Sequence, residues 1–123
     1  MEPGGLARWQ WDGYPLYHQS RTNLLIHIVL VPVFLGGNIA LLAGIALRFW
    51  LLVLAGFAAM AISFAVQGYG HGREANPSIP FSGPANASAR VFLEQWVTFP
   101  RFFFSGGWSR ALRSESLRIR QKN

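Results

Sequence analysis

The sequence predicts an all-α membrane protein, built on a transmembrane helical hairpin with one or two shorter C-terminal interfacial or re-entrant helices. Of its 123 residues, 51% are hydrophobic and only 13% are charged, and the mean hydropathy is +0.25. A soluble domain usually carries about a quarter charged residues. The ten Phe and five Trp also exceed what so small a soluble core can bury. We therefore expect a single membrane domain.

The charge balance and the absence of cysteine narrow the class further. Without Cys, a disulfide scaffold, a thiol nucleophile and an iron–sulfur cluster are excluded. The chain has 11 Lys and Arg against 5 Asp and Glu, a net charge of +6. In a membrane protein we expect this charge to face anionic lipid headgroups. The expected partners are therefore membrane lipids and not nucleic acid.

Residues 1–21 are expected to form an interfacial arm, because their aromatic residues stand among Gly and Pro. The 43 residues from Leu24 to Val66 then carry one formal charge, Arg48. A single helix of that length would span ~65 Å, about twice a bilayer core of roughly 30 Å. Since a charge costs least at an interface, the chain is expected to turn back at Arg48. This predicts a hairpin over residues 22–70, with helices Leu24–Leu47 and Phe49–Tyr69.

Small residues recur at every fourth position on both predicted helices. They are Gly36, Ala40 and Gly44 on the first helix, and Ala55, Ala59 and Ser63 on the second. Such rows allow close backbone contact between helices in a membrane. We expect the two rows to face each other.

The rest of the chain is divided by composition. Residues 71–90 are rich in Gly, Pro, Asn and Ser and are expected to form a loop. Residues 91–107 are expected to form membrane-associated helices. Residues 108–123 form a basic tail. Because the tail, Arg73, Arg90 and Arg101 lie on one side of the hairpin and Arg48 on the other, both termini are expected to be cytoplasmic. The expected location is a bacterial inner membrane, or the endoplasmic reticulum of a eukaryote.

The three histidines of the chain are predicted to converge. His27 lies 21 residues before Arg48 and His71 lies 23 residues after it, so at ~1.5 Å per residue their depths differ by only ~3 Å. His18 precedes Ser20 and Thr22, either of which could cap the first helix. It therefore lies before the helix, and its side chain can turn toward the other two histidines. Ionisable residues beside spanning segments usually face an interior and act there. We expect His18, His27 and His71 to share a metal ion.

Three polar residues are candidates to support this site. Asn23 and Gln67 each stand four residues before a histidine, His27 and His71 respectively, and are expected to orient the imidazoles. Glu74 is the nearest carboxylate in sequence and the expected fourth ligand. Nitrogen and oxygen ligands without sulfur suit Fe(II), Mn(II) or Zn(II).

Three segments together carry a resemblance to a known family. They read YHQSRTNLLIHIVLVPVF, QGYGHGREANPSIPF and EQWVTFPRFF. Between about Tyr14 and Trp108 the chain resembles the small membrane proteins that include the iron-dependent 2-hydroxy fatty acid dioxygenase of fungal phytosphingosine breakdown. The most specific parts are the run of His18, Asn23 and His27, and the run from Gln67 to Gly72.

The resemblance implies a multi-helix membrane fold and an Fe(II) centre held by His18, His27 and His71 as catalytic residues. It also implies an enzyme that removes one carbon oxidatively from a long-chain 2-hydroxy fatty acid, with O2 as co-substrate. In that reaction we expect Arg21 or Arg73 to bind the carboxylate of the acid.

Two other function classes stay open at this point. The first is an electron-transfer protein that binds haem through His27 and His71. The second is a non-enzymatic adaptor, in which the hairpin anchors a basic tail that binds lipids or a partner.

Overall fold

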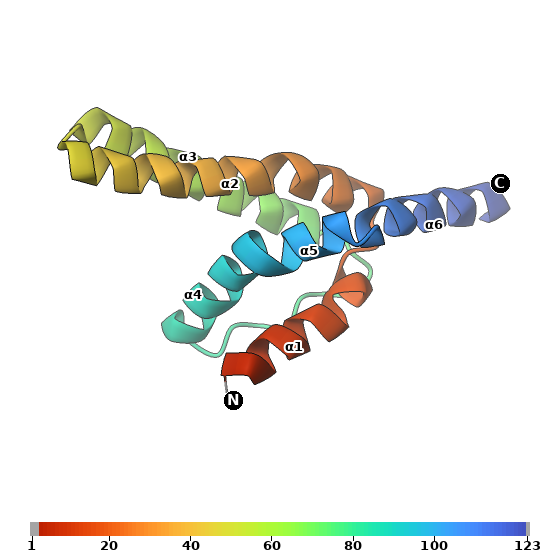
Figure 1. The fold of residues 1–123 in the computed structure, drawn as a ribbon. Helices are drawn as coiled ribbons and strands as arrows, with labels where there is room; N and C mark the ends of the chain where they lie inside the picture. Colours follow the sequence, from red (N-terminus) through yellow and green to blue (C-terminus); the bar gives the residue numbers. More distant parts are fainter. Residues whose placement is uncertain (1–2, 123) are drawn as a thin grey trace.

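The computed structural model describes residues 3–122, with side chains described for residues 4–118. The described chain is helical and has no strand. In order, its elements are α1 (Pro3–Gly13), η1 (Tyr14–Tyr17), α2 (Arg21–Leu47), α3 (Trp50–His71), α4 (Pro84–Leu93), η2 (Glu94–Thr98), α5 (Phe99–Phe104) and α6 (Gly107–Lys122). Helices α2 and α3 form an antiparallel hairpin, and the shorter helices gather at its open end (Figure 1).

The predicted hairpin and its turning point are confirmed. Helix α2 begins after Ser20, whose hydroxyl accepts the N–H of Asn23. It ends at Arg48, which adopts the left-handed conformation at φ 53° and closes the helix with its backbone N–H on Gly44 and Ile45. Helix α3 starts two residues later, so the turn is as short as two antiparallel helices allow.

The small residues that pack the hairpin follow a spacing of seven and not the predicted spacing of four. Four contacts join α2 to α3 or to the turn before it, and their positions sum to the same number in each case. They are Asn23 with Gly70, Leu30 with Ser63, Gly37 with Gly56, and Gly44 with Phe49. A seven-residue repeat keeps one seam facing the partner and produces a left-handed supercoil. Of the predicted rows, Gly44, Ser63 and the partly buried Ala59 lie in or beside this seam. Gly36 and Ala55 are exposed, and Ala40 is partly buried without a contact of this kind.

Replacing Gly56 by Ala is expected to lower the free energy of unfolding by about 1 to 3 kcal/mol, because overpacking strains two backbones that already touch. A Cβ at Gly56 would lie 2.6 Å from the Gly37 carbonyl oxygen and 2.6 Å from the Leu41 nitrogen. Gly36→Ala is the matched control, since a Cβ there has no described atom within 4 Å. The control should gain about 0.5 to 1 kcal/mol from helix propensity. Equal free energies of unfolding for the two variants in denaturant titration would contradict the placement of Gly56, and not Gly36, in the seam.

Helices α2 and α3 are long and apolar enough to cross a membrane, with mean hydropathies of 2.3 and 2.0. Only 28% and 17% of their most apolar windows are buried. The core helix of a soluble protein would be mostly buried, whereas these helices present Val29, Ile39, Leu42 and Phe57 outward. An apolar outer face of this kind is typical of a lipid-facing hairpin.

The segment after the hairpin differs from the expected loop over residues 71–90. The loop ends at Gly83, and α4 runs from Pro84. Proline is favoured at the first helical position, and the Ala-rich run after it favours helix. No residue of α4 is fully buried, and its half-buried positions, such as Ala87, Arg90 and Val91, lie on one face of the helix. Helices α4, η2 and α5 then continue one into the next through residues 84–104 (Figure 1).

The main hydrophobic core lies at the open end of the hairpin. It joins Tyr14 of η1, Leu24 and Val31 of α2, and Phe99 and Phe102 of α5. Helix α6 is anchored to it by Trp108, whose indole N–H donates to the Leu24 carbonyl at 2.8 Å. The predicted basic tail is therefore a helix fixed at its start, and its last basic residues, Arg120 and Lys122, have side chains outside the described part. This core surrounds the end of the hairpin that carries the histidines.

Candidate metal centre

The first histidine of the site, His18, is held by the short helix before it. Its ring stacks on Tyr14, with ring centroids 3.6 Å apart and planes 13° from parallel. Its Nδ1 lies 2.8 Å from the Tyr14 carbonyl oxygen. Since a carbonyl only accepts hydrogen bonds, Nδ1 carries the proton and Nε2 keeps a free lone pair.

His27 is fixed in the same way on the second turn of α2. It is 0% exposed, and its Nδ1 donates to the Asn23 carbonyl at 3.0 Å. Asn23 thus contacts the histidine as expected, but through its backbone and not its amide. The Nε2 atom of His27 again keeps its lone pair. A metal-binding histidine commonly has its other nitrogen held by such a hydrogen bond.

The third histidine, His71, closes the cluster from the last turn of α3. Its Nδ1 is buried and has no described hydrogen-bond partner. The three ring centroids lie 4.8 to 5.0 Å apart, and each pair of rings is close to perpendicular, at 83° to 89°. The structure therefore brings together the three histidines that the sequence places at one level.

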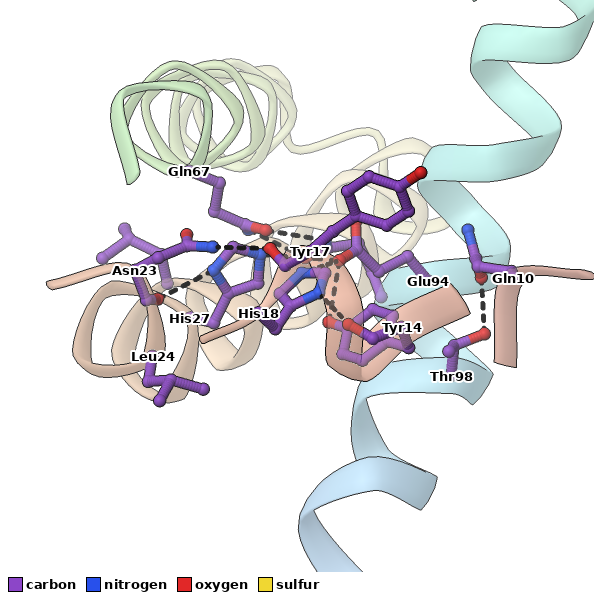
Figure 2. A network of polar contacts seen from close by, with 12 residues as sticks. Gln10, Tyr14, Tyr17, His18, Asn23, Leu24, His27, Gln67, Glu94 and Thr98 are labelled. Atoms are coloured by element: carbon purple, nitrogen blue, oxygen red, sulfur yellow. Dashed lines mark hydrogen bonds and ion pairs between the residues drawn. The ribbon is translucent and has the colours of Figure 1, made fainter. Parts of the chain in front are cut away.

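Glu94, and not Glu74, is the carboxylate beside these rings. Its Oε2 lies 3.2 Å from Nε2 of His18 and 3.5 Å from Nε2 of His27. The same oxygen accepts the Tyr14 hydroxyl at 2.8 Å, and Figure 2 shows this contact beside His18 and His27. One ligand atom from each histidine and one from Glu94 all lie within 4.8 Å of one another. Three histidines and one glutamate are thus close enough to hold a metal ion.

The chemistry of the donor atoms fits a cation. Nε2 of His18, Nε2 of His27 and Nδ1 of His71 are buried without a described hydrogen-bond partner. On His18 and His27 the free lone pair faces a carboxylate oxygen, which is also an acceptor, so no hydrogen bond joins them. A buried polar atom without a partner costs about 1 to 3 kcal/mol. A metal ion among these acceptors would satisfy all of them.

The protonation states of the groups outside the spanning helices agree with this fit. Burial lowers the pKa of His18, although the contact with Glu94 opposes the shift. Burial alone would raise the pKa of Glu94, but its contacts with His18 and His27 outweigh burial and hold that pKa well below the usual range. Burial, followed by the Glu94 charge, raises the pKa of Tyr14. Burial therefore favours the neutral imidazole at His18, which is the form that binds metal, and the protonated phenol at Tyr14. The lowered pKa of Glu94 requires positive charge beside the carboxylate, which protons on the imidazoles or a metal ion would supply.

Glu94 stands at the start of a π-helical turn, η2. The N–H of Phe99 donates to the Glu94 carbonyl, five residues back, and Pro100 has no N–H to continue the regular pattern. Within this turn Gln95 faces α3 and Thr98 faces α1, where it contacts Gln10 (Figure 2). Such wide turns are frequent at functional sites.

Glu74, the expected fourth ligand, has a different role. Its carboxylate accepts the backbone N–H groups of Gln19 and Ser20, at 2.9 to 3.2 Å, and the Asn23 amide at 2.8 Å. A carboxylate at the start of α2 also complements the helix dipole. Glu74 therefore fixes the chain that leaves His18 against the loop that leaves His71.

Gln67 also differs from its expected role as the partner of His71. Its amide forms a reciprocal pair with Gln95, at 2.8 and 2.9 Å, and donates to Ser63. This pair joins α3 to the π-helical turn next to Glu94. Gln67 thus positions the carboxylate of the cluster and not the histidine.

A cavity of about 650 Å³ opens beside the cluster, with His18, His71 and Glu94 among its lining residues. Most of the wall is apolar and comes from α1, α3, α4 and the loop before α4. Neither Arg21 nor Arg73 lines it, and both are exposed. Arg90 is the arginine that does. Arg21 and Arg73, the arginines expected to bind the carboxylate, thus lie outside the wall of this cavity.

The residues that sequence reasoning missed are Glu94, Tyr14, Gln95 and Arg90. One signal was present for Glu94, because it is an acid in the apolar run from Val91 to Phe99, where a charge is costly unless it has a function. Tyr14 and Gln95 give no comparable signal. Their roles depend on contacts between distant segments.

Comparison with known protein families, curated proteins and solved structures finds no match for this chain.

Proposed function

We propose that this protein is an Fe(II)-dependent dioxygenase that shortens long-chain 2-hydroxy fatty acids by one carbon. The observation that carries the proposal is the cluster itself. Three histidines and Glu94 each offer a ligand atom within 4.8 Å of the others, each histidine has a buried nitrogen without a described partner, and the cluster lies at the wall of a largely apolar cavity. The resemblance to the fungal enzyme supplies the substrate class and the choice of iron.

The ligand set supports iron chemistry. Histidine and carboxylate ligands with open positions are typical of non-haem Fe(II) oxygenases. Bound Fe(II) would supply the one-electron chemistry that activates O2 toward the substrate. With the three histidines as ligands, a six-coordinate ion would keep three open positions, two for an acid that chelates through its carboxylate and hydroxyl and one for O2. With Glu94 also bound only two would remain, so the chelating acid would take the position of Glu94.

The overall reaction balances without another reductant. A 2-hydroxy acid and one O2 give the acid one carbon shorter, CO2 and water, as the C1–C2 bond breaks. The substrate loses four electrons and O2 gains them. The cavity therefore needs to admit only the acid and O2.

The chain's own residues would keep the site ready for this reaction. The carbonyl groups of Tyr14 and Asn23 hold His18 and His27 in the tautomer that leaves Nε2 free. Tyr14 donates to Oε2 of Glu94, which keeps that carboxylate turned toward the histidines. Tyr14 and Phe102 cover His18 and Phe99 covers His27, which limits the access of water.

We place the open end of the hairpin, with both termini, on the cytoplasmic side of the membrane. Arg73, Arg90, Arg101 and the basic residues of α6 lie at that end, whereas Arg48 lies at the tip. Cytoplasmic segments carry the excess of Lys and Arg. A bacterial inner membrane, or the endoplasmic reticulum, fits this orientation.

The geometry does not favour haem. In a haem protein with two histidine ligands, the rings lie on opposite faces of a flat porphyrin, whereas here three rings and a carboxylate point toward one small space. A non-enzymatic adaptor would not need a buried cluster of histidine nitrogens without hydrogen-bond partners. The purified protein should therefore show no Soret band, and its metal content should fall when the histidines are replaced.

The direct test loads the purified protein with Fe(II) under anaerobic conditions and then adds O2 and 2-hydroxyhexadecanoic acid. Mass spectrometry should detect pentadecanoic acid, with CO2 released in equal amount. Hexadecanoic acid is the matched control and should give no product, because it lacks the hydroxyl that chelates. Iron-loaded protein that shortens no 2-hydroxy acid would overturn the proposal.

A further inference from the structure

We propose that the cavity binds a single-chain carboxylic acid with its carboxylate on Arg90, and that the acyl chain leaves past Gly68 toward the bilayer. The nature of the acid rests on the proposed function, but its binding does not require turnover. Arg90 lines the cavity, whereas Arg21 and Arg73 are exposed and do not.

Arg90 lies one turn before Glu94 in the continuous helical run that α4 begins, and both line the cavity. Its guanidinium is held by the carbonyl groups of Ile79 and Pro80, at 2.8 and 3.1 Å. It also lies over the ring of Phe81, 4.5 Å from its centroid, and over Trp9 at 5.1 Å. These contacts fix the position of the guanidinium in the wall.

The charge of Arg90 has no carboxylate within 4.0 Å among the described side chains. Its hydrogen bonds use Nη1 and Nη2, and Nε has no described acceptor. An arginine can therefore still offer Nε–H and a second Nη2–H, which form a fork that matches a carboxylate. The wall of the cavity also carries the carboxylates of Asp12 and Glu94, and Arg90 is the one arginine or lysine among its described lining residues. The guanidinium is therefore the group in this wall that is complementary to the head of a fatty acid.

Part of the cavity wall lies on the outer face of the hairpin, where Phe64 and Gly68 of α3 are exposed. A Cβ at Gly68 has no described atom within 4 Å, so the glycine leaves this side of the opening clear. Because Phe64 and Gly68 stand on a helix with the length and hydropathy of a membrane span, an acyl chain that passes them meets lipid.

The first experiment measures the contribution of Arg90 to carboxylate binding. Zn(II)-loaded protein, which does not turn over, is titrated with 2-hydroxyhexadecanoic acid and with hexadecane-1,2-diol, which keeps the chain and the hydroxyl. Arg90→Gln should weaken binding of the acid about tenfold or more, the usual value of a charge-assisted hydrogen bond, and leave the diol within about twofold. Arg101→Gln is the control, because Arg101 lies over Trp11 at 3.9 Å but does not line this cavity.

A merely structural role of Arg90 predicts a different result. If the residue only holds the loop at Ile79 and Pro80, the acid and the diol should weaken by the same factor in Arg90→Gln. That result, or unchanged binding of both ligands, would overturn the assignment of the carboxylate to Arg90.

The second experiment tests the exit of the chain. Gly68→Phe should weaken binding of 2-hydroxyhexadecanoic acid about tenfold or more, because the ring fills the opening, but leave 2-hydroxybutanoic acid unaffected. Gly36→Phe is the matched control, since Gly36 is also an exposed helix glycine without described neighbours. Normal binding of the long acid to Gly68→Phe, or equal loss of both acids, would overturn the assigned exit.

These results are independent of catalysis. If wild-type protein discriminates acid from diol through Arg90 but shortens no acid, the binding mode stands and the dioxygenase proposal fails. If the protein shortens 2-hydroxy acids and Arg90→Gln has no selective effect on acid binding, the dioxygenase proposal stands and the assignment of the carboxylate to Arg90 fails.

Discussion

Replacing His27 by Ala is expected to weaken metal binding more than about a hundredfold and to abolish turnover. Loss of a residue that only supports a ligand already costs about 10- to 100-fold in affinity, and His27 would be a ligand. Its ring is fully buried, with Nε2 3.5 Å from Glu94, so no water or neighbour can take its place without rearrangement. The measurement is metal content after dialysis against a weak chelator, followed by titration. His18→Ala and His71→Ala should behave in the same way.

Gly56→Ala is the control for His27→Ala. Gly56 is buried in the hairpin seam, where a Cβ would meet Gly37 and Leu41 and not the histidines. Both substitutions should therefore cost stability, but only His27→Ala should lose metal. Full metal content and activity in any one histidine variant would remove that residue from the site.

Replacing Glu94 by Gln is expected to lower metal affinity by about 10- to 100-fold and to stop turnover. Gln keeps the size and the acceptor oxygen but removes the negative charge that stabilises a divalent cation. Tyr14 would then donate to a neutral amide, which is a weaker acceptor than a carboxylate. Metal titration of the purified variant measures the effect.

Two other glutamates serve as controls for Glu94→Gln. Glu74→Gln should keep metal affinity within about threefold and lower the free energy of unfolding by about 1 to 2 kcal/mol, because its carboxylate binds the start of α2. Glu115→Gln should change neither property, since Glu115 pairs with the exposed Arg118. Loss of metal in Glu74→Gln with full retention in Glu94→Gln would restore the ligand set that the sequence suggests.

The hairpin could be predicted because its signals are local. One charge, Arg48, in an apolar run of 43 residues sets the turn, and counting along two helices from that turn places His27 and His71 at one level. The position of His18 could also be predicted, because Ser20 caps α2 and leaves His18 outside the helix. The packing seam was harder to predict, since Gly36 and Gly37 are adjacent and only their contacts show which one faces α3.

The fourth ligand could not be predicted from neighbouring residues. Glu74 is near His71 in sequence, but the loop turns its carboxylate to the backbone of Gln19 and Ser20. Glu94 reaches the cluster only because α4 and η2 fold back along α1 and α2. That path depends on contacts such as the Gln67–Gln95 pair and the Trp96 indole, which donates to Asn38. None of these contacts has a periodic signal.

The order in which the ribosome makes the chain has a consequence for this site. Its members are separated by up to 76 positions, from His18 to Glu94, and no two come from the same helix. The hairpin can enter the lipid before Glu94 has been synthesised, and at that stage no complete ligand set exists. A site with all four ligands would therefore form only after α4 and η2 have docked, at a late step of biogenesis.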